Sequence, residues 1–455
     1  MLPSASFSIA ELRKITAIQH YEERMLFTTL FLRHPRRRLV YITSLPVDEA
    51  IVEYYLSFLP DAHSARSRLH LVSLGDGGDE PLTHKLLGRP DALGRVRELV
   101  DGHDAYVLPF NVTAGEGRLA DALDLPFFGA GPDLAWLGSK TGSRQVARRA
   151  GIPVPEGSEG HHSLAEVERA VHALRQRQPV AQAVVIKLNE GFSGQGNAIV
   201  DLNGPLAPLA GSNTTFCADD ESWSTFPDKV AREGAIVEEL LRHDGMASPS
   251  VQMRIAPSGT HEVLSTHDQV LGGNANQVYL GCRFPARASY RIAIQDAATR
   301  VAEVLSAEGV IGSFGVDFLV VPGTGARGAD GVYLSEINLR MGGTTHPYWM
   351  ARLATEAEYH VDTGELVAQS GPRCYVATDN LKSERLAGLS PSQVIDAVDR
   401  AGLGYDSGSR AGATLHLLGA IPRFGKMGTT CIGASPEEAE ELYREVVATV
   451  EGLGR

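Results

Sequence analysis

Two apolar runs on either side of a glycine-rich loop constrain the fold of this chain most strongly. The runs Phe314–Val321 and Val332–Ile337 are rich in β-branched and aromatic residues, and the segment between them contains Pro322 and several glycines. This pattern predicts two antiparallel strands joined by a loop. If the loop centre lies between residues 326 and 327, Asp317 is expected to lie opposite Glu336.

Polar residues at the end of this hairpin predict a metal site. Glu336 and Asn338 are two positions apart, so they share one face of a strand at a separation of about 7 Å. Together with Asp317 they offer two carboxylates and one amide, and Mg²⁺ prefers such hard oxygen ligands. The alternative is that the three side chains end a hairpin in solvent, and this alternative is favoured if the two strands are considered in isolation.

The composition is that of a globular protein with several packed units. Hydrophobic residues make up 43% and charged residues 21% of the 455 positions, which is an ordinary balance. The net charge of −13 argues against a general affinity for nucleic acid or for an anionic membrane. Four cysteines without a CxxC pair indicate neither a disulfide framework nor a zinc site, and a reducing cytoplasm is expected. No apolar run approaches the ~20 residues that a bilayer requires, so no membrane partner is expected.

The order of the predicted elements divides the chain into four parts. A helix is expected from Ser8 to Met25, and alternating strands and helices between residues 39 and 108 predict a parallel sheet covered by helices. Antiparallel strand patterns and a long helix at Tyr290–Glu308 follow. Ser390 and Ser435 begin capping boxes with proline at the first helical position. The expected fold class is α/β and α+β, with an N-terminal domain at 1–135, two antiparallel-sheet subdomains at 136–245 and 246–375, and a small C-terminal α+β unit at 376–455.

Lysines beside glycines predict a phosphate site. Lys187 ends a predicted strand and is followed by the loop Gly191–Gly196, which contains three glycines. Their backbone N–H groups can turn toward an anion while the ammonium group adds a point charge. Lys140 begins a predicted helix that ends at Ala150. A flexible turn with a surface lysine is the alternative explanation in each case.

Three other sites of chemistry are excluded by spacing. The pair Gly425-Lys426 is followed by Met427, so it lacks the Ser or Thr of a Walker phosphate loop. The GxGxxG string at Gly323–Gly328 leads into a strand instead of a helix, so it does not predict a dinucleotide site. Ser193 lacks the GxSxG spacing of a serine hydrolase.

Taken in order along the chain, these residues resemble the ATP-grasp carboxylate–amine ligases. The resemblance rests on the lysines Lys140 and Lys187, on Val316–Phe318 and on the string EINLRMGG at Glu336–Gly343, and it is strongest over residues 100–345. It implies the ATP-grasp architecture, in which residues 136–245 form a lid subdomain and residues 246–375 a metal-binding subdomain.

The resemblance also implies a role for individual residues. Lys140 and Lys187 would contact the α- and β-phosphates of ATP, and the loop Gly191–Gly196 would cover the β- and γ-phosphates. Arg340 would face the reacting carboxylate and, with Lys187, is the expected catalytic group. The other implied ligands are Gly191, Ser193, Gly194 and Gly196 for the phosphates, Glu238, Glu239, Leu240 and Leu241 for adenine, Asp317, Glu336 and Asn338 for Mg²⁺, and Gly342, Gly343, Thr344 and His346 for the substrate.

The implied reaction joins two small molecules with ATP. The carboxylate of a non-proteinogenic, guanidino-bearing amino acid would attack the γ-phosphate, and the N-terminal amine of a peptide would displace phosphate from the acyl phosphate. ATP and two Mg²⁺ ions, replaceable by Mn²⁺, are the implied cofactors, and a homodimer is compatible with the resemblance. A bicarbonate-activating carboxylase and a non-catalytic nucleotide-binding module remain alternatives, although no Met-Lys biotinylation string is present.

Two positions depart from the family pattern. Many members carry an arginine two residues before the first metal-binding acid, where this chain has Gly315. Many also carry a ribose-binding acid where this chain has Gly245, next to Asp244. Arg340 is therefore expected to act alone on the reacting groups, and the ribose ligand stays unassigned.

Overall fold

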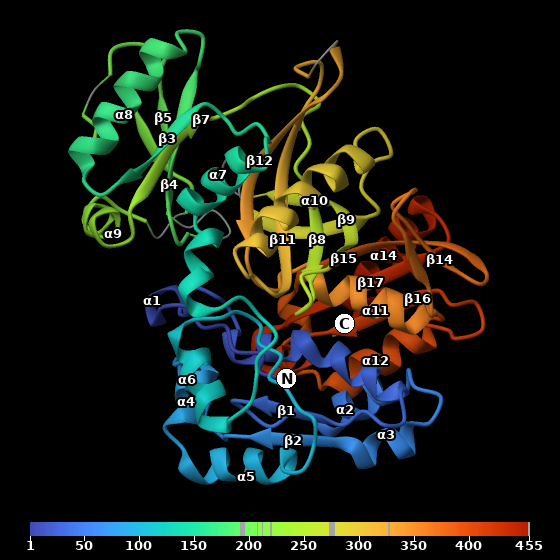
Figure 1. The fold of residues 1–455 in the computed structure, drawn as a ribbon. Coiled ribbons are helices and arrows are strands. Elements are labelled where there is room, and N and C mark those ends of the chain that lie inside the picture. Colours follow the sequence, from blue (N-terminus) through green and yellow to red (C-terminus); the bar gives the residue numbers. More distant parts are fainter. Residues whose placement is uncertain are drawn as a thin grey trace.

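Three sheets organise the described part of the chain (Figure 1). The computed structural model describes residues 1–191, 196–206, 208–211, 213–218, 221–272, 278–325 and 328–453, without the side chain of Ala10. A two-stranded parallel sheet lies in the predicted N-terminal domain, a five-stranded antiparallel sheet in the predicted lid subdomain, and a ten-stranded sheet runs through the rest. The mixture of α/β and α+β units agrees with the fold class that the sequence predicts.

The N-terminal sheet is parallel, as the alternation of strands and helices predicts. Strand β1 (Leu39–Thr43) pairs with β2 (Leu69–Ser73) over its full length. Isolated parallel bridges extend the sheet, because Leu2 pairs with Pro109 and Val107 with Phe127. The helices of this domain are α2 (Glu49–Leu56), α3 (Ala62–Arg68), α4 (Leu82–Leu87), α5 (Pro90–Val100) and α6 (Ala114–Leu123).

The expected helix from Ser8 to Met25 is interrupted, so this prediction is wrong in part. The Ser8 side chain caps α1 (Ile9–Leu12) by accepting a hydrogen bond from the N–H of Glu11, but the α-helix contains only 4 residues. Ala17 then adopts a left-handed conformation with φ of 65°, and the chain continues as the 3-10 helix η1 (Ile18–Arg33). A left-handed residue cannot continue a right-handed helix, so the periodic apolar residues are divided between two helices.

The lid subdomain is built on a sheet with the strand order β3-β7-β4-β5-β6. Helices α8 (Leu164–Arg177) and α9 (Phe226–Glu233) pack against it and enclose an apolar core of its own. All six residues of β4 are buried, which explains the continuous apolar run that ends at Lys187. The strands are β3 (Gly157–His161), β4 (Ala183–Leu188), β5 (Asn197–Asp201), β6 (Thr214–Phe216) and β7 (Ala235–Glu239).

The ten-stranded sheet carries the predicted metal-binding hairpin (residues 312–338) at one edge and continues into the C-terminal unit. Strand β15 (Gly371–Lys382) pairs with β10 (Val278–Phe284) on one side and with β17 (Lys426–Gly433) on the other. The proposed boundary between residues 375 and 376 falls inside β15. The other strands are β8 (Pro249–Ile255), β9 (His261–Gly272), β11 (Gly312–Val321), β12 (Gly331–Asn338), β13 (Glu358–His360), β14 (Glu365–Ala368) and β16 (Gly412–His416).

Helices cover this sheet and join it to the N-terminal domain. The predicted helix at Tyr290–Glu308 is α10 (Arg291–Ala307), which packs against β8 and β9. One apolar core holds side chains from both ends of the chain, including Phe27, Tyr41 and Tyr375. The remaining helices are η2 (Pro132–Gly138), α7 (Lys140–Arg149), α11 (Thr345–Thr355), η5 (Glu384–Leu386), α12 (Pro391–Arg400), η6 (Leu418–Ala420), α13 (Ile421–Phe424) and α14 (Pro436–Gly452).

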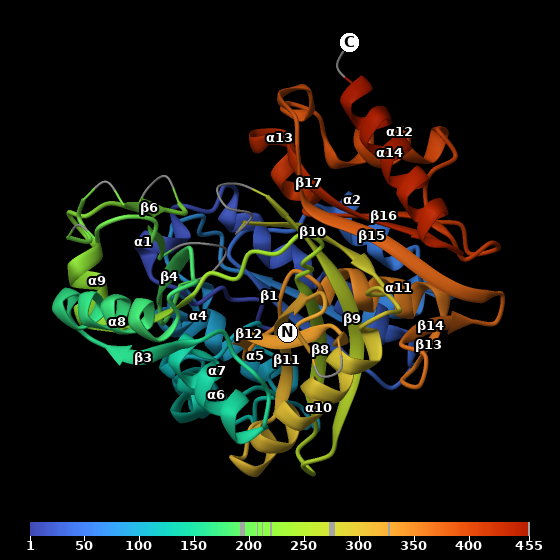
Figure 2. The ribbon, with the colours of Figure 1, turned by 90° about the horizontal axis from the view of Figure 1, so that it is seen from above.

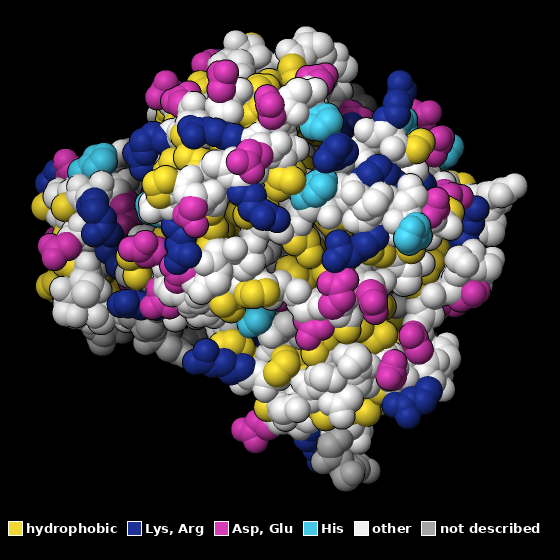
Figure 3. Space-filling view, turned by 90° about the horizontal axis from the view of Figure 1, so that it is seen from below, with side chains coloured by type: hydrophobic (Ala, Val, Ile, Leu, Met, Phe, Trp, Pro, Cys, Tyr) yellow, Lys and Arg dark blue, Asp and Glu magenta, His cyan; other side chains and the backbone are white. Residues whose placement is uncertain are grey.

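Two further views show how these parts are arranged. From above, the lid sheet lies on one side and the C-terminal helices α12 and α14 on the other, with β8 and β11 between them (Figure 2). From below, basic and acidic side chains are interspersed with apolar ones over the visible face (Figure 3). Among the described residues, no helix has the length and apolar character needed to cross a membrane.

Close packing of α7 against η2 provides a test of the fold. A β-carbon at Gly142 would lie 2.1 Å from the carbonyl oxygen of Trp136 and 2.8 Å from the Cα of Leu137. We expect Gly142→Ala to lower the free energy of unfolding by about 1–3 kcal/mol, because backbone atoms must move apart. Chemical denaturation measures this change.

A second glycine supplies the matched control. Gly94 lies within α5, and a β-carbon there would meet no atom within 4 Å. Gly94→Ala is expected to raise the free energy of unfolding by about 0.5–1 kcal/mol, because alanine restricts the unfolded chain. Equal stability of the two variants would contradict the packing of α7.

Candidate active site

A cavity of about 2500 Å³ lies between the lid subdomain, the ten-stranded sheet and the N-terminal segment. The elements that carry the predicted phosphate ligands line it, and so do the elements that carry the predicted metal ligands. Fourteen of the predicted site residues line it: Lys140, Lys187, Gly191, Glu238, Glu239, Leu240, Leu241, Asp317, Glu336, Asn338, Arg340, Gly342, Gly343 and Thr344.

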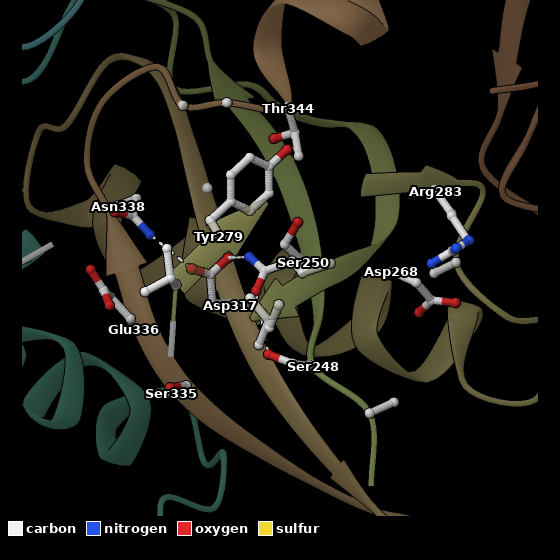
Figure 4. A pocket seen from close by; sticks show the side chains of 18 of the residues that line it. Ser248, Ser250, Asp268, Tyr279, Arg283, Asp317, Ser335, Glu336, Asn338 and Thr344 are labelled. Atoms are coloured by element: carbon white, nitrogen blue, oxygen red, sulfur yellow. Dashed lines mark hydrogen bonds between the residues drawn. The ribbon is translucent and has the colours of Figure 1, made fainter. Parts of the chain in front are cut away.

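The metal hairpin has the register that the sequence predicts. In the antiparallel pair of β11 and β12, Asp317 lies opposite Glu336, which confirms the expectation. Asp317 accepts hydrogen bonds from Gln269 Nε2 at 3.0 Å and from Asn338 Nδ2 at 3.0 Å. These bonds hold both oxygens of the Asp317 carboxylate at the floor of the cavity (Figure 4).

The donor set of the hairpin suits a hard cation. Burial first, and the neighbouring Glu336 carboxylate second, raise the pKa of Asp317 to about 7. A divalent ion between the two carboxylates would relieve this repulsion, and oxygen donors are what Mg²⁺ prefers. Within the described residues, no group of three or more His, Cys, Asp or Glu side chains is arranged to hold a metal ion. Two carboxylates and the Asn338 amide are thus the candidate ligands.

Helix α7 brings Lys140 to the hairpin. Lys140 is 4% exposed, and its Nζ lies 2.7 Å from Glu336 Oε1 and donates to the carbonyl oxygen of Gly191 at 2.9 Å. The helix is anchored at its N-terminus by Asn189, whose Oδ1 accepts from the Thr141 N–H at 3.0 Å. One lysine therefore contacts both the predicted metal-binding hairpin and the first residue of the glycine loop.

Lys187 is held by an ion pair that sequence analysis missed. Its Nζ lies 2.6 Å from Glu238 Oε1, and Arg144 Nη1 lies 2.9 Å from Glu238 Oε2. Arg144 is 2% exposed and follows Lys140 by one helical turn on α7. Glu238 thus binds the side chain of Lys187 from near the end of β7, so its carboxylate acts here as a partner of the lysine.

Arg340 lies beyond the end of β12 and faces the cavity. Its Nη1 donates to the carbonyl oxygen of Met341 at 3.1 Å, and its guanidinium carbon lies 5.6 Å from the centroid of the Phe7 ring. Burial is the main cause that lowers the pKa of Arg340, and the charge of Arg24 lowers it further. Phe7 and Arg24 come from the N-terminal segment, which the sequence analysis did not connect with the site.

The loop after Arg340 also reaches the cavity. Thr344 and Tyr279 lie together on the same side of Asp317 (Figure 4). A β-carbon at Gly343 would lie 2.8 Å from Tyr279 Cε1, so glycine permits the close approach of the aromatic ring. Tyr279 on β10 had no sequence signal, because a single aromatic residue in an apolar strand is usually part of the core.

Other predicted residues lie elsewhere or outside the described part. His346 is 1% exposed, does not line the cavity, and its Nδ1 lies 2.7 Å from the carbonyl oxygen of Arg24. It contributes to packing between α11 and η1 and not to the cavity wall. Gly196 pairs its carbonyl with the N–H of Leu188 and does not line the cavity. Ser193 and Gly194 fall outside the described residues.

Known families and relatives match most of the sequence. Residues 210–340 match the family described as IQCH-like, ATP-grasp, and residues 393–446 match the PGM1 C-terminal domain. L-propargylglycine--L-glutamate ligase of Streptantibioticus cattleyicolor is 32% identical over 453 residues, which are 97% of this chain and 91% of that protein. The IQ motif-containing protein H of Danio rerio is 21% identical in an alignment of length 344 that covers 63% of this chain and 32% of that protein.

Solved structures share the fold at low identity. The N5-carboxyaminoimidazole ribonucleotide synthetase from Thermus thermophilus aligns with a TM-score of 0.54 and 15% identity, covering 95% of this chain and 98% of its own. A biotin carboxylase from Campylobacter jejuni aligns with a TM-score of 0.55 and 12% identity, covering 94% and 88%. Over its full length the sequence also resembles the pheganomycin peptide ligase. The chain therefore belongs to the ATP-grasp carboxylate–amine ligases and is an ATP-dependent, ADP-forming enzyme.

Proposed function

We propose that this enzyme joins the carboxylate of an amino acid to the amine of a second amino acid or of a peptide, through an acyl phosphate. The observation that carries the proposal is the convergence of Lys140, Lys187, Arg340 and the oxygen donors of the hairpin on one cavity. The name of the Streptantibioticus relative describes the ligation of two amino acids, which supports small-molecule substrates of this class.

The proposed reaction requires compensation of charge more than covalent help. The substrate carboxylate attacks the γ-phosphate of ATP and ADP leaves; the amine then attacks the acyl carbon and phosphate leaves. Lys140 and Lys187 bind the phosphates, and Arg340 stabilises the negative charge of the reacting acyl phosphate. These cations are already positioned by hydrogen bonds and ion pairs, so little reorganisation is needed when charge develops.

The metal ligands and the adenine segment complete the proposal. Asp317, Glu336 and Asn338 would hold Mg²⁺, which supplies positive charge at the β- and γ-phosphates. We propose two ions, and we expect Mn²⁺ to replace Mg²⁺. Glu239 to Leu241 leave the lid sheet along the cavity wall, where backbone groups can bind an adenine edge. A homodimer and a non-proteinogenic, guanidino-bearing donor remain part of the proposal.

Removal of single charged groups tests the site. Lys187→Ala and Glu336→Ala are each expected to lower kcat by about a hundredfold to a thousandfold, the usual effect of losing one preorganised contact. Phosphate release measures the rate, and thermal unfolding checks that each variant folds. Lys382→Ala is the control, because Lys382 is exposed and does not line the cavity. Near-wild-type turnover of either site variant would disprove the assignment.

The dependence on the second substrate tests the reaction class. ADP and phosphate release is measured with a panel of amino acids as donors, guanidino-bearing ones included, with and without amines and with bicarbonate. We expect turnover that requires both a carboxylate and an amine, and a product whose mass equals the two substrates less water. Turnover with bicarbonate and no amine would instead indicate a carboxylase, and no turnover a nucleotide-binding module.

Metal removal tests the hairpin separately. Treatment with EDTA is expected to abolish turnover, and added Mg²⁺ or Mn²⁺ to restore it. Asn338→Ala should raise the Mg²⁺ concentration needed for half-maximal activity by about tenfold or more, because one oxygen ligand is lost. An unchanged metal requirement in this variant would place the metal elsewhere.

A further inference from the structure

Lys426 is a buried cation without a carboxylate partner in the described chain. It is 6% exposed, and its Nζ donates to the hydroxyl oxygen of Tyr21 at 2.7 Å. Every other described lysine that is buried lies beside a carboxylate: Lys85 with Asp76 at 3.9 Å, Lys140 with Glu336 at 2.7 Å, and Lys187 with Glu238 at 2.6 Å.

A charge in such a position needs a counter-charge. Removing an ammonium group from water is unfavourable unless an anion compensates its charge. Lys426 lines the same cavity as the two lysines of the phosphate site. An anion that enters the cavity can therefore supply what the described protein side chains do not.

A second cation contacts the tyrosine that Lys426 contacts. The guanidinium carbon of Arg24 lies 4.6 Å from the centroid of the Tyr21 ring, and Lys426 Nζ lies 4.9 Å from the same centroid. Arg24 Nη1 pairs with Asp379 at 2.9 Å, while its buried Nε has no hydrogen-bond partner. Asp379 also binds His416 Nε2 at 2.9 Å. Of the two cations, only Arg24 therefore has a described carboxylate partner, and His416 contacts the same carboxylate.

This group is separate from the phosphate and metal ligands but lies close to the reacting end of the cavity. Arg24 and Arg340 both line the cavity. The guanidinium carbon of Arg24 lies 5.3 Å from the centroid of the Phe110 ring, and the carbonyl oxygen of Phe110 accepts the N–H of Met341, which follows Arg340. Asn380, next to Asp379, donates from Nδ2 to the carbonyl oxygen of Tyr279 at 3.3 Å. The cations therefore lie on the side of the site where Tyr279 and the loop of Gly343 meet the cavity.

We propose that Arg24 and Lys426, with the Tyr21 hydroxyl, bind a carboxylate of an amino-acid substrate other than the carboxylate that is phosphorylated. The inference rests on the proposed function and names the substrate class: a substrate that keeps a free carboxylate during ligation. Arginine and lysine both form charge-assisted hydrogen bonds to carboxylates. The carboxylate belongs either to the amine substrate or to a second acidic group of the donor, and the experiment separates the two.

The test compares each substrate with its carboxamide analogue. For the donor and acceptor that support turnover, kcat/KM is measured with the free carboxylate and with the amide, in the wild type and in Lys426→Gln. We expect the preference for the carboxylate to fall by about tenfold or more in the variant, the effect of one hydrogen bond to a charged group. The substrate whose preference falls identifies the source of the carboxylate. A preference unchanged for both substrates would overturn the proposal.

Two controls keep the result interpretable. Lys382 is the cross-strand partner of Lys426 and is exposed, so Lys382→Gln should keep the wild-type preference. If Lys426→Gln does not fold, Arg24→Gln provides the second variant with the same expected loss. Calorimetric titration with each substrate and with its carboxamide analogue tests the subsite without turnover. Failure of the proposed function would appear as absent amine-dependent phosphate release in the wild type, while this binding preference would still be measured.

Discussion

The active site depends on the position of helix α7 between two sheets. Its first residue, Lys140, pairs with Glu336 on the ten-stranded sheet, and Arg144, one turn later, pairs with Glu238 on the lid sheet. Ser143 Oγ on the same helix accepts the N–H of Ile337 at 2.9 Å. Because these contacts involve charged or backbone groups that are buried, a shift of the helix would leave several of them unpaired at once. The distance between the proposed phosphate ligands and the proposed metal ligands is thereby fixed by one element.

Charge balance separates the roles of the buried cations in the cavity. Lys140 and Lys187 each have an acidic partner in the protein, and a triphosphate with its metal would enter a site where positive and negative groups are already matched. Lys426 and Arg24 together have only Asp379 among the described acids. The first arrangement suits a ligand that arrives with its own cation, and the second suits a bare carboxylate. One cavity therefore offers two electrostatic environments.

The sequence was most informative where local pattern determines geometry. Alternation and loop symmetry predicted that Asp317 lies opposite Glu336. The glycine stop placed the end of α7 within one residue, and the capping box with its proline placed the start of α14. The break at Ala17 was not predictable, because neither a glycine nor a proline marks it. Arg144 and Lys426 were missed for a different reason: their importance comes from burial and from partners far away in the chain, which no local spacing encodes. The N-terminal segment, which lines the cavity, was missed for the same reason.

The pairing of β15 with both β10 and β17 makes the C-terminal unit continuous with the rest of the ten-stranded sheet. Backbone hydrogen bonds therefore cross the junction between the proposed metal-binding part and the last eighty or so residues. Removing these last residues would leave the edges of β10 and of the rest of β15 unpaired. Unpaired strand edges invite association with other chains. The C-terminal unit therefore depends for its stability on the same sheet that carries the active site.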